Sequence, residues 1–90
     1  MAPSREVMIA NKRGLHARAA ARFASLAATF NSHVHVQRGD LRANGKSIMG
    51  LMMLAAPIGT TIILQANGED AEAALEALNA LVEDRFGEGE

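Results

Sequence analysis

Ninety residues without a cysteine are enough for one small domain and exclude disulfides, thiolate metal sites and cysteine nucleophiles. No apolar stretch approaches the roughly 20 residues of a membrane span, and the first residues lack the pattern of a signal peptide, so we expect a cytoplasmic protein. The net charge of −1 conceals an asymmetry, because residues 1–46 carry +6 and residues 47–90 carry −7. A basic half indicates an anionic partner, unless folding mixes the two halves on one surface.

The first half of the chain predicts a strand, a loop and a helix. Residues 6–10 alternate in polarity, as in a half-buried strand, and Gly14 marks the loop over 11–15. From about residue 16 to residue 30 the apolar period becomes helical. The apolar stripe of this helix consists of Phe23, Leu26, Ala27 and Phe30.

The second half predicts a hairpin, a short helix, a strand and a final helix. Strict alternation over 33–37 indicates a strand, and a turn at 38–40 leads to its partner from residue 41. Ser47 is expected to cap a short helix over 48–54, and 60–66 is the clearest strand. Asp70 is expected to cap a helix that ends near residue 84, and residues 84–90 are expected to form a flexible tail.

The order β-α-β-β-α-β-α, with a hairpin in the middle, predicts the fold class. Residues 1–90 should form one α+β domain, an open-faced β-sandwich with a four-stranded antiparallel sheet and three helices on one face. His33 and His35 should lie on the outer face of the hairpin, and because no third ligand is evident we expect no metal site.

His16 stands out because it precedes the first helix, two residues after Gly14 and two before Arg18. Backbone N–H groups at a helix start lack acceptors within the helix and favour an anion. A histidine there can hold a transferred phosphoryl group, whose oxygens Arg18 would neutralise. The alternative is that His16 merely precedes the helix and Gly14 makes the turn.

Two motifs at a defined separation carry a family resemblance. They are Gly14-Leu15-His16-Ala17-Arg18 and Asn44-Gly45-Lys46-Ser47-Ile48-Met49-Gly50-Leu51, and residues 57–60 and 68–70 also fit. Over nearly its whole length the chain resembles the HPr phosphocarrier family of the bacterial phosphotransferase system. Within that family it looks more like the nitrogen-related branch than the sugar-transport branch.

The resemblance implies that His16 accepts a phosphoryl group from phosphorylated enzyme I, which phosphoenolpyruvate charges, and passes it to a IIA-type protein. It also implies that Arg18 stabilises the anion and that Ser47 is a regulatory phosphorylation site for a serine kinase. The protein would then be a covalent carrier without a cofactor, rather than an independent enzyme, and we expect a monomer.

One departure from the family pattern is Ala19, where most members have proline. Proline early in a helix fixes φ, and the N–H group that it lacks would have no acceptor within the helix anyway. Alanine can adopt the same backbone conformation, but it makes the start of the helix less rigid. We expect the cost to be about 0.5–1 kcal/mol, exerted through the unfolded state.

Partner-binding residues are predicted around His16. Lys12, Arg13 and Arg22 would enlarge the positive rim, although surface Lys and Arg commonly only solvate a face. An apolar docking patch is the second part of the prediction, and the alternative is that about half of its members are core. The predicted patch consists of Leu15, Ile48, Met49, Leu51 and Met52.

Three other functions fit the sequence less well than phosphoryl transfer. A regulatory adaptor acting only through Ser47 is the main alternative, but the chain keeps His16 and Arg18. A nucleic-acid binder lacks a stacking platform, because the chain has no Tyr or Trp and Phe23 and Phe30 lie on the apolar stripe. A phosphate-binding P-loop fails in register, because Asp40 stands where a glycine is required.

Overall fold

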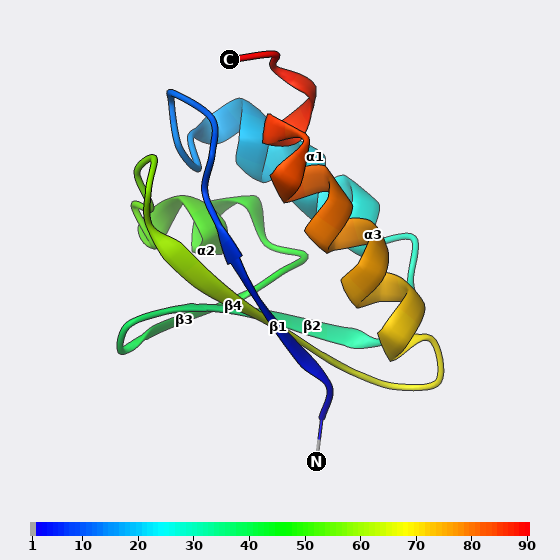
Figure 1. The fold of residues 1–90 in the computed structure, drawn as a ribbon. Coiled ribbons are helices and arrows are strands. Elements are labelled where there is room, and N and C mark those ends of the chain that lie inside the picture. The colour runs from blue at the N-terminus through cyan, green and yellow to red at the C-terminus, as the bar shows by residue number, and fades with distance from the viewer. Residues whose placement is uncertain (1) are drawn as a thin grey trace.

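In the computed structural model, which describes residues 2–90, the elements follow the predicted order and a short 3-10 helix is added at the end. The strands are β1 (Ser4–Met8), β2 (His33–Arg38), β3 (Leu41–Asn44) and β4 (Thr61–Asn67). The helices are α1 (Ala17–Ala27), α2 (Ile48–Met53), α3 (Ala71–Glu83) and the 3-10 helix η1 (Arg85–Gly87). All three α-helices lie over one face of the sheet, which confirms the open-faced α+β sandwich (Figure 1).

The sheet has the order β1-β4-β2-β3, and its three pairings are antiparallel. The pairing of Arg38 with Leu41 leaves a two-residue turn, in which Gly39 adopts a positive φ of 57°. Inward residues of the two central strands, among them Val36 and Leu64, are fully buried beneath the helices. The core therefore lies between the sheet and one layer of helices, and the other face of the sheet is uncovered.

Helix α1 is shorter than the sequence predicts, because it ends at Ala27 rather than near residue 30. The N–H groups of Thr29 and Phe30 donate to carbonyls three residues back, and the Thr29 hydroxyl also donates to the Leu26 carbonyl. These bonds tighten the chain into turns of the 3-10 type and stop the α-helix.

The prediction that residues 84–90 form a flexible tail is wrong. Phe86 is completely buried and η1 packs against α1 and α3. The chain reverses because Arg85, Phe86 and Gly87 all have a positive φ, which points the Phe86 ring back into the core. Arg22 also donates a hydrogen bond to the Phe86 carbonyl, and Lys12 N–H donates to the Glu90 carbonyl at 3.1 Å.

Asp70 occupies the position before α3, as predicted, but its side chain does not cap that helix. Its carboxylate instead accepts the backbone N–H groups of Asn31 (2.8 Å) and Ser32 (2.9 Å) and the Ser32 hydroxyl. The Ser32 hydroxyl is the main cause that lowers the pKa of Asp70, and the Asn31 N–H adds to it. Asp70 thus ties the start of α3 to the loop between α1 and β2.

Candidate functional site

The loop before α1 can be closed only by a glycine at position 14. Gly14 has a φ of +65°, and a Cβ there would lie 2.4 Å from the Ala56 carbonyl oxygen. The same carbonyl accepts the Leu15 N–H at 2.9 Å, so the loop is held against the segment between α2 and β4. This contact fixes where the next residue, His16, leaves the loop.

His16 is the residue that precedes α1, and its backbone is extended, with φ −81° and ψ −179°. Its carbonyl accepts the Ala20 N–H at 2.8 Å and so starts the helix, while its side chain makes no capping hydrogen bond. The imidazole therefore takes no part in capping the helix. It stands at the helix end where the backbone dipole favours negative charge.

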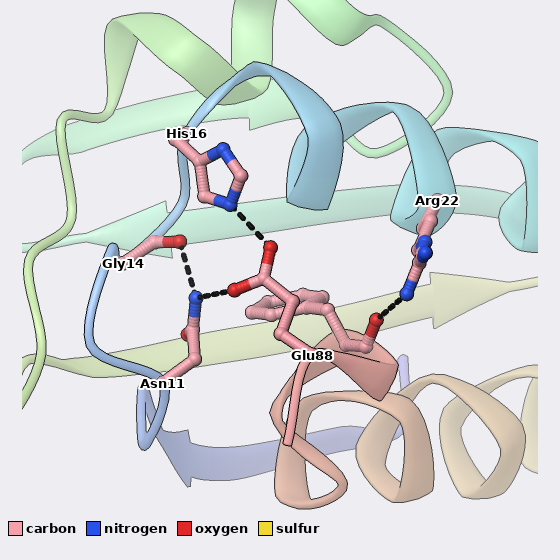
Figure 2. Close-up of polar contacts among 6 residues, drawn as sticks. Asn11, Gly14, His16, Arg22 and Glu88 are labelled. Carbon is pink, nitrogen blue, oxygen red and sulfur yellow. Dashed lines mark hydrogen bonds and ion pairs between the residues drawn. The ribbon is translucent and has the colours of Figure 1, made fainter. Parts of the chain in front are cut away.

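Glu88 of the C-terminal segment contacts His16 directly, as Figure 2 shows. One carboxylate oxygen pairs with His16 Nε2, and the other accepts from Asn11 Nδ2 at 2.9 Å. Asn11 Nδ2 also donates to the Gly14 carbonyl at 2.7 Å, which connects the tail to the loop. The side chains of His16 and Glu88 are 23% and 12% exposed, so solvent screens this pair only in part.

The pKa of Glu88 lies below its usual value. Burial alone raises the pKa of this carboxyl, but the hydrogen bonds from Asn11 and His16 and the nearby charges of His16 and Arg13 outweigh burial. Glu88 is therefore an ionised acceptor at neutral pH. Asn11 is completely buried, and its Oδ1 has no hydrogen-bond partner among the described residues.

Three arginines gather beside this contact. Arg13, Arg18 and Arg22 line a cleft of about 310 Å³ together with Gly87, Glu88 and Glu90. Arg18 and Arg22 come from successive turns of α1, as the sequence predicts. The cleft brings the basic half of the chain against its acidic end, so part of the charge asymmetry is neutralised within the molecule.

The prediction of an apolar docking patch is wrong for Leu15 and Leu51, because both are buried in the core. Neither side chain is therefore available to a docking surface. Ile48, Met49 and Met52 are exposed, and so is Met53, which lies outside the predicted patch. Lys12 and Arg13 are exposed as expected.

Ser47 caps α2, as predicted, and accepts the Gly50 N–H at 3.0 Å. The side chain is half-buried rather than enclosed. It lies next to the exposed Ile48 and Met49, so any charge added at Ser47 would adjoin the apolar surface.

His33 and His35 alternate on β2 with the buried Val34 and Val36, so both histidines face the uncovered side of the sheet. Burial lowers the pKa of His35, and the charges of Arg42 and His33 lower it further. Within residues 2–90 no three His, Cys, Asp or Glu side chains are arranged to hold a metal ion. No helix of that part of the chain is long and apolar enough to cross a membrane.

Known proteins that are similar to this chain agree on one family. The family model described as the PTS HPr component phosphorylation site matches residues 3–84. The phosphocarrier protein HPr of Cupriavidus necator is 51% identical over 96% of this chain and 97% of its own. The phosphocarrier protein NPr of Shewanella violacea is 46% identical over 93% of this chain and 92% of its own.

A solved structure agrees with these relatives. The crystal structure of HPr-C-His from Thermoanaerobacter tengcongensis superposes with a TM-score of 0.91 at 43% identity and covers 96% of this chain and 97% of its own. The chain therefore belongs to the HPr family of phosphocarrier proteins of the phosphotransferase system. Relatives carry both the HPr and the NPr name, so the nitrogen-related branch stays a prediction.

Proposed function

We propose that the protein accepts a phosphoryl group on His16 from phosphorylated enzyme I and passes it to a IIA-type protein. The observation that carries this proposal is the position of His16, whose imidazole stands free of the helix cap at the start of α1. The family to which the chain belongs supplies the phosphocarrier role.

The surroundings of His16 suit a group that must be received and then released. N–H groups at the start of α1 and the Arg18 guanidinium attract the phosphoryl oxygens without a metal ion. Arg18 is exposed, so water weakens its attraction and the phosphoryl group is not trapped. Partial stabilisation of this kind is what a relay requires, since its phosphorylated form must remain a good donor.

Partner binding is assigned to two neighbouring surfaces. Arg13, Arg18 and Lys12 would attract the acidic surface of a partner, and the exposed side chains of α2 would bury apolar area against it. Phosphorylation of Ser47 by a serine kinase would add up to about two negative charges beside this surface. We infer that this modification weakens partner binding.

The proposal is tested by incubating the protein with enzyme I and phosphoenolpyruvate and measuring its intact mass. The wild type should gain one acid-labile phosphoryl group, whereas His16→Ala should gain none. His33→Ala is the matched control, because it removes an exposed histidine from the far face of the sheet, and it should be labelled like the wild type. Labelling of His16→Ala at the wild-type level would exclude His16 as the acceptor.

A further inference from the structure

We propose that Glu88 is a positioning residue for phosphoryl transfer, which holds His16 in the one orientation and tautomer that make Nδ1 the nucleophile. This inference rests on the proposed function and assigns a role to the C-terminal segment. The observation behind it is the contact of one Glu88 oxygen with His16 Nε2, drawn in Figure 2.

The tautomer follows from the chemistry of the two groups. An ionised carboxylate has no proton to donate and can only accept, so the hydrogen between Glu88 and His16 belongs to Nε2. A neutral imidazole carries one N–H, and the other nitrogen then holds the lone pair. Nδ1 is therefore left as the nucleophile, on the side of the ring away from Glu88.

The Glu88 carboxylate and the turn before it are both held in place. Its second oxygen accepts from Asn11, which is buried and anchored to the Gly14 carbonyl. The preceding turn is fixed by the buried ring of Phe86, whose carbonyl accepts a hydrogen bond from Arg22. Such support restricts the Glu88 side chain and, through it, the imidazole.

Phosphoryl transfer to Nδ1 requires no proton to leave that nitrogen, because Nδ1 carries a lone pair and no hydrogen. The Nδ1 lone pair forms the new bond to phosphorus, while the bond between phosphorus and the donor breaks and its electron pair stays with the donor. Nε2 keeps its hydrogen, so the ring acquires positive charge. That charge lies against the Glu88 carboxylate, as in other sites where a carboxylate orients a reacting histidine.

Two variants separate this role from a general effect of the acidic tail. Glu88→Gln keeps the size of the side chain and removes its charge. Glu90→Gln is the matched control, because Glu90 lines the same cleft and the contact to His16 belongs to Glu88. Phe86 and Arg22 are unchanged in both variants, so the segment should remain packed.

The first measurement uses the unphosphorylated protein and is independent of transfer. Nitrogen-15 NMR of the imidazoles, at a pH where they are neutral, should show His16 with its hydrogen on Nε2 in the wild type and in Glu90→Gln. In Glu88→Gln the two tautomers should both be populated. His33 and His35 are internal references, because they lie on the other face of the sheet.

The second measurement is the rate of phosphorylation by enzyme I and phosphoenolpyruvate. We expect Glu88→Gln to lower the maximal rate by about tenfold, the lower end of the loss seen when the hydrogen-bond partner of a metal-ligating histidine is removed. The KM for the protein should change little, and Glu90→Gln should react like the wild type. Equal maximal rates for the two variants, or an unchanged His16 tautomer in Glu88→Gln, would overturn the inference. A wild type that takes up no phosphoryl group would instead refute the proposed function itself.

Discussion

At the scale of single residues, the site depends on contacts that span the whole sequence. His16 contacts Glu88, which is 72 residues away in the sequence. The loop before His16 packs against the Ala56 carbonyl. Asp70 makes a comparable contact elsewhere, because its carboxylate satisfies the N–H groups of Asn31 and Ser32. In the contacts of Glu88 and Asp70, a polar side chain joins two segments that lie far apart in the sequence.

We expect Asp70→Asn to destabilise the protein in a pH-dependent manner. The pKa of Asp70 is lower in the folded protein than its usual value, so its stabilisation is present at neutral pH and is lost as the pH falls through the folded pKa. The Tm of Asp70→Asn should be several degrees below that of the wild type at pH 7, and the difference should shrink below about pH 4.

Thermal unfolding followed from pH 7 to pH 3 checks this prediction. Asp40→Asn, in the exposed turn between β2 and β3, is the matched control and should leave the Tm near that of the wild type. A Tm difference between Asp70→Asn and the wild type that stays constant over the range would show that the carboxylate charge is not responsible.

At the scale of elements, the C-terminal segment belongs to the folded domain. Helix α3 ends at Glu83, yet the chain continues through η1 and lies across the start of α1 (Figure 1). Phe86 fills the core between these helices and brings Glu88 to His16. Packing of one aromatic side chain and orientation of the site are therefore coupled.

We expect Phe86→Ala to lower the free energy of unfolding by about 3–5 kcal/mol, the usual cost of removing a buried aromatic ring. Denaturant unfolding measures this, and Met53→Ala, which removes an exposed side chain, should change stability by less than about 0.5 kcal/mol. If Phe86→Ala were as stable as Met53→Ala, the C-terminal segment would not be packed in solution.

The strongly periodic elements were predictable from the sequence, and the irregular ones were not. Strand β4 and helix α3 have clear apolar periods, and the structure contains both. Leu51 could not be separated from its exposed neighbours, because six residues of α2 are too few to define a face. The burial of Phe86 depends on three consecutive positive φ angles, which have no periodic signature.

The same contrast holds for the candidate site. His16 and Arg18 were predicted because a local motif contains both. Glu88 was missed because its contact depends on the reversal of the chain after α3, and Asn11 was noted only as a loop residue. The apolar Phe86 just beyond the last helix, followed by glycine, could have indicated a packed tail.

At the scale of the whole molecule, one end carries both His16, the proposed acceptor, and the surfaces proposed to bind partners. The loop before α1, the start of α1 and the exposed face of α2 hold the basic and apolar side chains, while His33 and His35 face the opposite side of the sheet. A carrier of this size offers only a small surface to a partner, so a single charge near that surface can change its affinity for the partner.

We expect Ser47→Asp to bind enzyme I about tenfold more weakly than the wild type, because the added carboxylate adjoins the apolar face of α2 and opposes an acidic partner. Calorimetry at fixed salt concentration measures the difference. Ser47→Ala removes the cap without adding charge, and Thr61→Asp adds the same charge on the uncovered face of the sheet. Both controls should bind like the wild type, and a similar loss in Thr61→Asp would attribute the effect to net charge alone.

The central claim, that His16 carries a phosphoryl group between two partners, is tested most directly by intact-mass measurement over time in a two-step reaction. The protein is first charged with enzyme I and phosphoenolpyruvate, then separated from them and mixed with a IIA-type acceptor. We predict that one acid-labile phosphoryl group appears on the wild type in the first step and disappears in the second, and that His16→Ala is never labelled. A wild-type protein that remains unlabelled, or that retains its phosphoryl group in the presence of the acceptor, would contradict the claim.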